Sequence, residues 1–233
     1  MTNVNYTAEL LQRDKIERKH IIELLKRIKD EYSISGNKIT ELGCGLGQNL
    51  EVFKDDNYII GVEGVQDAVD LAQHLDINVI LGDLNEPLML ESNSFDWVMC
   101  LDVLEHLMNP FELMKEIHRI LKNEGKAILN VPNHFTLSGR VKMLFGNGMD
   151  VHNYFPNHKE WENPHIRFFT RSGFFEMIAS AHFEIIDDYS YLVPSIPKSA
   201  MLINTGFSRN IYWVTKRFPA LFAAGNFVVL EKL

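Results

Sequence analysis

The sequence predicts a single α/β domain, doubly wound around a mostly parallel sheet, over its 233 residues. Strand-like and helix-like patterns alternate along most of the chain, as they do in βαβ units. The run at 95–101 is almost uninterrupted by polar residues, which is typical of a strand covered on both faces. No repeat or low-complexity linker divides the chain. These observations together favour one Rossmann-like domain with helices on both faces of the sheet.

The first half of the chain begins with a helix predicted over 7–31, since Ile21, Leu24, Leu25 and Ile28 recur at helical spacing. A short strand at 38–42 leads into a glycine-rich turn at 43–47. The elements expected after that turn are a helix near 48–54, a strand at 58–63, a helix at 66–75 and strands at 78–81 and 95–101.

The second half begins with a helix that Asn109 caps and that has Pro110 at its first position. We expect Gly125 to end this helix. Its buried stripe is predicted to be Leu113, Met114, Ile117, Ile120 and Leu121. The elements expected next are a strand at 127–131, a helix at 170–181 and strands at 183–191 and 226–231, while 134–165 shows no clear period.

Composition narrows the class of protein. The net charge is −8, with 31 acidic against 23 basic residues, which disfavours a general nucleic-acid-binding protein. Two cysteines cannot build a disulfide scaffold. The first residues are polar and no long apolar run occurs, so we expect neither a signal peptide nor a spanning helix. The expected location is the cytoplasm.

The charge is unevenly distributed. Residues 39–110 contain 14 acids and a single base, Lys54. This segment offers almost no positive side chains to bind a phosphate-rich ligand, although helix N-termini can bind phosphate without basic side chains.

The glycine turn contains Gly43, Gly45 and Gly47 directly after a predicted strand. In open α/β sheets the ligand lies beyond the carboxyl ends of the strands, and glycine lets the backbone approach it closely. Glu63 ends the next strand, 20 residues beyond Gly43, where a carboxylate can bind a ribose; the alternative is a solvated loop acid. Asp83 ends the third strand and could accept from an adenine amine, or form an Asx-turn.

Two kinds of cofactor are candidates for such a turn. A dinucleotide fingerprint needs a third glycine where this chain has Gln48, and Glu41 would repel a pyrophosphate. S-adenosylmethionine has adenine, ribose, a sulfonium and an ammonium group but no phosphate, so acids would attract it. The residues therefore favour this cofactor over a nicotinamide dinucleotide.

Several segments also resemble a known family. Residues 41–47, with the sequence ELGCGLG, resemble the first motif of the class I S-adenosylmethionine-dependent methyltransferases, with Glu41 where Asp is more usual. Residues 165–170 resemble a later motif of a subgroup with many small-molecule and glycan-cluster members. Other resembling segments are 61–65, 82–84, 95–107 and 226–232.

The resemblance implies a seven-stranded sheet whose last strand is antiparallel. It also implies S-adenosyl-L-methionine as cofactor and S-adenosyl-L-homocysteine as product. The candidate cofactor-binding residues in and around these motifs are Glu41, Gly43, Cys44, Gly45, Gly47, Asn49, Glu63, Gly64, Asp83, Leu84, Leu101 and Asp102.

The candidate catalytic bases are His106, just past the fourth strand, and His134, just past the fifth. A hydroxyl acceptor loses a proton as it attacks the methyl group, so a base helps. We therefore expect O-methylation of a small-molecule, glycan or lipid-linked hydroxyl by in-line transfer. Either histidine could instead have a purely structural role. The N/D-P-P-Y/F motif of base-amine methyltransferases is absent, and the alternatives are a nicotinamide-dependent oxidoreductase or a non-catalytic cofactor-binding protein.

The domain 1–233 is expected to carry an N-terminal helical cap at 1–35 and an insert at 134–169. The insert is rich in aromatic residues, which favours a packed cover over the acceptor pocket. Its histidines match no standard ligand spacing, so we expect no metal site. Its four histidines are His134, His152, His158 and His165.

The segment 195–224 is apolar and basic. A basic amphipathic helix can lie on a membrane surface, but more often packs on its own domain or on a second copy. Peripheral membrane contact, and a monomer or a homodimer, both stay open. The acceptor remains unnamed by the sequence.

Overall fold

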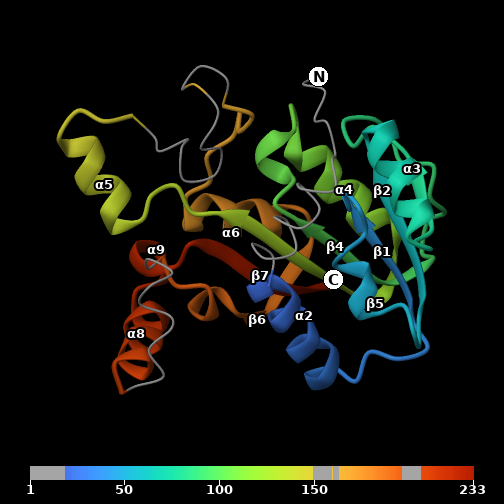
Figure 1. Ribbon diagram of the computed structural model, residues 1–233, viewed down its shortest axis with the longest axis horizontal. Helices are drawn as coiled ribbons and strands as arrows, with labels where there is room; N and C mark the ends of the chain where they lie inside the picture. The colour runs from blue at the N-terminus through green and yellow to red at the C-terminus, as the bar shows by residue number, and fades with distance from the viewer. Residues whose placement is uncertain (1–18, 149–158, 160–162, 196–205) are drawn as a thin grey trace.

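The computed structural model describes residues 19–148, 159, 163–195 and 206–233 (Figure 1). Among these residues, three short 3-10 turns accompany the helices: η1 at Leu50–Val52, η2 at Leu104–His106 and η5 at Ser190–Leu192. The described helices are α2 (Lys19–Glu31), α3 (Gln66–His74), α4 (Pro110–Ile120), α5 (Leu137–Leu144), α6 (Arg171–Ser180), α8 (Gly206–Arg217) and α9 (Pro219–Phe222).

A seven-stranded sheet forms the centre, with the order β3-β2-β1-β4-β5-β7-β6. Its strands are β1 (Lys38–Leu42), β2 (Tyr58–Glu63), β3 (Val79–Leu81), β4 (Phe95–Leu101), β5 (Leu121–Pro132), β6 (Phe183–Asp188) and β7 (Gly225–Lys232). The pairs among β1 to β5 are parallel, and β7 is antiparallel to both β5 and β6. The predicted fold is confirmed.

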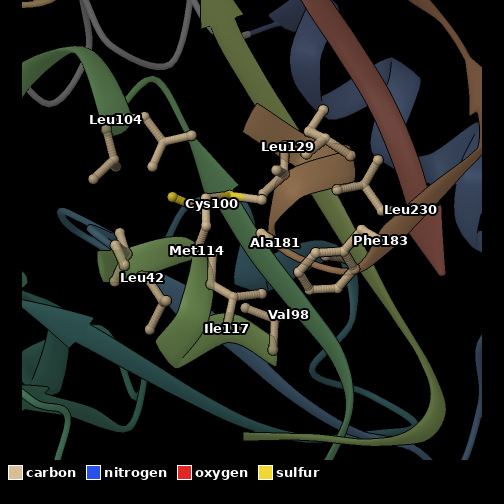
Figure 2. Packing of buried hydrophobic residues seen from close by; sticks show 14 of the residues in the cluster. Leu42, Val98, Cys100, Leu104, Met114, Ile117, Leu129, Ala181, Phe183 and Leu230 are labelled. Atoms are coloured by element: carbon tan, nitrogen blue, oxygen red, sulfur yellow. The ribbon is translucent and has the colours of Figure 1, made fainter. Parts of the chain in front are cut away.

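Helices cover both faces of the sheet because its strands alternate apolar side chains between the two sides. On one face Val98, Cys100 and Leu129 pack against Met114 and Ile117 of α4, as Figure 2 shows. On the opposite face lies a second cluster, to which α2, η1 and α3 contribute. That cluster includes Leu25, Ile28, Leu50, Val69, Met99, Ile128 and Phe227. The carboxyl ends of β1, β2 and β4 therefore meet at one edge of a rigid three-layer structure.

The helix expected over 48–54 is wrong in extent, because only the 3-10 turn η1 forms there. The expected end of α4 at Gly125 is also wrong. The helix ends at Ile120, and Leu121 already pairs with Phe95 of β4. The next pair along the ladder is Trp97 with Lys126, so residues 122–125 bulge out of the strand. Strand pairing thus ends the helix earlier than the glycine would.

Three further elements differ from the sequence-based expectation. Helix α5 lies in the segment without a predicted period, and no residue of it is buried, so no apolar stripe marks it. The final part of 183–191 is the turn η5 rather than strand. Pro219 divides the expected basic helix into α8 and α9, since proline breaks a helix interior.

The N-terminal cap at 1–35 is described only from Lys19, and there α2 buries Leu24, Leu25 and Ile28 against the sheet. Within the described residues, no helix has the length and apolar character needed to cross a bilayer.

Candidate functional site

The glycine turn after β1 has left-handed backbone at all three glycines, with φ of +73° at Gly43, +54° at Gly45 and +75° at Gly47. A Cβ added at Gly43 would lie 2.5 Å from Val103 Cγ2, and one at Gly47 would lie 2.5 Å from Ile77 Cγ2. These two glycines are required by packing. A Cβ at Gly45 would meet nothing within 4 Å, so the turn is open at this position.

The Glu63 carboxylate, at the end of β2, fastens the turn to the neighbouring strand. Its Oε2 accepts from the backbone N–H of Gly45 at 2.8 Å, and its Oε1 accepts from that of Val65 at 3.0 Å. Each carboxylate oxygen can accept a second hydrogen bond. Glu63 therefore holds Gly45 in place and keeps acceptor capacity toward the open side of the turn, beside Gly64, which is exposed.

Asp83 and Leu84 follow the end of β3, the strand next to β2 in the sheet. Asp83 Oδ1 accepts from both the backbone N–H and the side-chain amide of Asn85, at 2.9 and 3.0 Å. These hydrogen bonds, the backbone one foremost, lower the pKa of the Asp83 carboxyl below its usual value. The geometry is that of an Asx-turn, and a contact of Asp83 with adenine stays a prediction. Leu84 lies close to Gly43, since a Cβ there would be 3.6 Å from Leu84 Cδ1.

The other predicted cofactor residues divide into buried and exposed groups. Glu41 is 1% exposed, and its Oε1 accepts from Asn49 Nδ2 at 2.6 Å. Cys44 and Leu101 are also buried and pack in the core. Asp102 is exposed, with φ of +57°, and accepts from Asn130 Nδ2 at 2.6 Å. Glu41 is therefore buried below the surface of the edge, whereas Asp102 is exposed there.

A cluster of one glutamate and three histidines lies beyond β4 at the same edge. Glu105 Oε1 is 3.9 Å from His165 Nε2 and 4.0 Å from His106 Nε2. His165 Nδ1 is hydrogen-bonded to His134 Nε2 at 2.8 Å. The fold thus brings together both predicted bases, a residue of the insert and a glutamate that sequence reasoning did not single out.

Burial controls the charges of this cluster. It raises the pKa of Glu105 to about 9, with a smaller contribution from the negative charge of Asp102. Burial also lowers the pKa of His134 to about 4 and that of His165 to about 3. His106, whose pKa burial also lowers, is the most open of the cluster, with 35% of its side chain exposed. At pH 7 the contacts are therefore between a neutral carboxyl and neutral imidazoles.

The insert at 134–169 contributes to this edge only in part. Residues 163–169 bring His165 back to the cluster, whereas α5 has no buried residue and His152 and His158 lie outside the described residues. A cover over the acceptor pocket stays a prediction. Glu105 was recognisable in the sequence only as an acid beside a histidine just past a buried strand.

A family model described as a methyltransferase domain matches residues 40–129 of this chain, from β1 to β5. Over this region the chain is therefore similar to a methyltransferase domain. The matched region includes the glycine turn, Glu63, Asp83 and the Glu105–His106 pair. It excludes His134 and His165, which follow the matched region.

Among curated relatives, the chain is 28% identical over 116 residues to a ubiquinone biosynthesis O-methyltransferase of Coxiella burnetii, covering 47% of this chain and 49% of that protein. An uncharacterized protein of Methanocaldococcus jannaschii is 31% identical over 137 residues, 57% of this chain and 56% of that protein. The chain thus spans about half the length of the curated relatives that it matches.

Solved structures show the same fold over nearly the whole chain. An S-adenosylmethionine-dependent methyltransferase of Thermotoga maritima has a TM-score of 0.63 at 17% identity and covers 97% of this chain and 95% of its own. A second, from Archaeoglobus fulgidus, has a TM-score of 0.58 at 18% identity and covers 97% and 100%. At this identity the likeness concerns the fold alone.

Proposed function

We propose that this chain transfers the methyl group of S-adenosylmethionine to a hydroxyl of a small-molecule, glycan or lipid-linked acceptor. The observation that carries the proposal is the edge itself, where the open turn at Gly45 and the Glu63 carboxylate lie along the same sheet edge as the histidine cluster after β4. The hydroxyl acceptor draws support from the Coxiella relative, whose name states an O-methyltransferase activity.

The space and the hydrogen-bond acceptors at this edge of the sheet are compatible with this cofactor. Gly45 leaves open space where a side chain would stand, and Glu63 offers acceptor capacity beside it for ribose hydroxyls. A cavity of about 260 Å³ lined in part by Gly82, Asp83 and Leu88 lies at the end of β3, where we expect the adenine of the cofactor. When bound, the cofactor supplies a methyl group on a positively charged sulfur, and the acids nearby favour that charge.

His106 is the residue that we place toward the acceptor. Its Nδ1 is 3.1 Å from the carbonyl oxygen of Pro164, which can only accept, so Nδ1 carries the proton. The lone pair of neutral His106 is then on Nε2, and the His106 side chain is the most exposed of the cluster. His134 directs its Nε2 at His165 and serves to position it.

Glu63→Ala should weaken binding of S-adenosylhomocysteine by about 1.5–3 kcal/mol if the carboxylate holds both ribose hydroxyls. The loss also frees the Gly45 N–H from its partner. Isothermal titration measures the effect. Asp67→Ala, an exposed acid in the first turn of α3, is the matched control and should bind as the wild type does. Unchanged affinity of the Glu63 variant would remove this residue from the cofactor site.

His106→Ala should lower kcat by at least about tenfold, the lower range of what one proton-handling group contributes. His134→Ala should lower kcat less, because its ring faces His165 rather than the open side. Both are measured with labelled methyl donor at saturating acceptor. If His134→Ala has the larger effect, the assignment of these two residues is reversed.

The activity itself is tested by incubating the full chain with labelled S-adenosylmethionine and panels of phenols, sugars and lipid-linked glycans. Transfer to a hydroxyl in one panel supports the proposal. Cofactor binding without transfer to any acceptor in a broad extract would instead favour a non-catalytic cofactor-binding protein. Tight binding of NAD(P)H with no response to S-adenosylhomocysteine would restore the oxidoreductase alternative.

A further inference from the structure

The side chain of Glu105 has an unusual environment. It is 1% exposed, and neither of its carboxylate oxygens has a hydrogen-bond partner among the described residues. Buried polar groups are otherwise almost always hydrogen-bonded, because desolvation without compensation is costly. Two imidazole nitrogens lie near one of these oxygens, Oε1: His165 Nε2 at 3.9 Å and His106 Nε2 at 4.0 Å. The arrangement leaves the position between these three atoms to be filled.

We propose that Glu105, His106 and His165 bind a divalent metal cation of the zinc and manganese class. One carboxylate and two imidazoles form a common donor set for such ions, and binding of the cation would displace the proton of the Glu105 carboxyl. Ligand atoms lie about 2.0–2.2 Å from such an ion, so two of them can be up to about 4.2 Å apart. The two distances from Glu105 fall within this span, whereas the bound of 4.8 Å on all the donor atoms exceeds it, so the two imidazoles have to move closer together to bind one ion. Small side-chain movements would complete the site. This proposal differs from the expectation drawn from the sequence, which was that no metal binds.

The backbone holds the donors in place. The carbonyl oxygen of Glu105 accepts from the N–H groups of both Ile166 and Arg167, at 2.9 and 3.0 Å. Arg167 also donates to the carbonyl of Met108. These contacts fasten the segment that carries His165 directly onto the turn that carries Glu105 and His106.

The imidazoles are oriented by groups behind them, as is typical of metal ligands. The Pro164 carbonyl oxygen accepts a hydrogen bond from the Nδ1–H of His106, which leaves the lone pair on Nε2, the atom near Glu105. His134 Nε2 takes the corresponding place behind His165 Nδ1, at 2.8 Å. His134 is therefore a positioning residue of this site rather than a ligand.

The site is closed on one side and open on the other. The side chains of Glu105 and His165 are 1% and 5% exposed, whereas that of His106 is 35% exposed. Three protein ligands with an open side are the pattern of catalytic rather than structural metal sites. Coordination positions on the side of His106 would then be available to a ligand from outside the chain.

The role of the cation rests on the proposed function, and it replaces direct proton abstraction by His106, because the Nε2 lone pair of that residue would bind the cation. A hydroxyl bound to a divalent cation has a lowered pKa and loses its proton to solvent more readily. The acceptor oxygen then forms the bond to the methyl carbon as the bond from that carbon to sulfur breaks. The electron pair of the broken bond stays on sulfur, which becomes the neutral thioether of S-adenosylhomocysteine. An acceptor with two adjacent oxygens, such as a catechol or a sugar diol, would occupy two open positions.

The binding test uses the full chain freed of metal by a chelator and titrated with Mn²⁺ or Zn²⁺ by calorimetry. We expect one cation per chain, with affinity reduced at least about tenfold in His106→Ala and in Glu105→Gln. His74→Ala, at the end of α3 away from the cluster, is the control and should bind as the wild type does. Circular dichroism and S-adenosylhomocysteine binding verify that each variant is folded; His106→Ala changes the most exposed ligand and keeps the test valid if Glu105→Gln does not fold. No binding by the wild type, or equal binding by folded variants, would overturn the site.

The catalytic role is tested separately by methyl transfer before and after chelation. Loss of transfer on chelation and its return with Mn²⁺ supports the role of the cation, and transfer that survives full metal removal refutes it. If the titration shows the cation site but no hydroxyl acceptor is ever methylated, the proposed function fails while the site stands.

Discussion

Gly45→Val is expected to abolish detectable binding of S-adenosylhomocysteine while the sheet stays intact. The added side chain would stand in the open space over the turn, where no atom lies within 4 Å of the new Cβ. That space is the place that the proposed function gives to the cofactor, so the branched side chain would exclude it. Calorimetric titration and circular dichroism measure binding and fold independently.

The matched control for this variant is Gly36→Val. Gly36 has φ of +72°, and a Cβ there also meets nothing within 4 Å, but it precedes β1 at the opposite edge of the sheet. Left-handed backbone should cost each variant a similar amount, about 1–2 kcal/mol of stability. Gly36→Val should then bind S-adenosylhomocysteine normally. Loss of binding in both variants would show that backbone strain, not occupation of the cofactor's place, is responsible.

Phe227→Ala is expected to destabilise the protein by about 3–5 kcal/mol, the usual cost of removing a large buried aromatic side chain. Phe227 is fully buried in the cluster beneath α2. It also lies on β7, the strand that joins β5 to β6, and its backbone carbonyl accepts from Tyr189 at 2.8 Å. Urea unfolding monitored by circular dichroism gives the free energy of unfolding.

Phe218→Ala serves as the comparison, because that ring is 45% exposed at the junction between α8 and α9. Its effect should stay within about 0.5 kcal/mol, as for most surface substitutions. Equal effects of the two variants would contradict the assignment of Phe227 to the core.

Much of the cofactor side of the edge was predictable from the sequence, because its parts are local. The strands β1, β2 and β4 each show their burial within a few residues, and parallel strands place their carboxyl ends at one edge. The turn at Gly45 and the acid at Glu63 follow such strands directly, so their proximity follows from the fold class. The hydrogen bond between them is a consequence of that arrangement.

Helix ends and exposed helices were less predictable. The end of α4 depends on Leu121 pairing with Phe95, a contact between separate segments, and not on the glycine downstream. Helix α5 has no buried face, so it leaves no periodic apolar signal.

The sequence by itself determined the doubly wound fold and the row of groups after successive strands, since both arise from short-range patterns. Only the tertiary structure decided which histidines meet. His106 contacts the backbone of Pro164, 58 residues away, and His134 contacts His165, 31 residues away. No spacing rule encodes such distances, because the return of the chain to β4 is fixed by packing and by the bonds of Ile166 and Arg167 to Glu105. Burial of Glu105 among imidazoles is therefore a property of the folded chain alone.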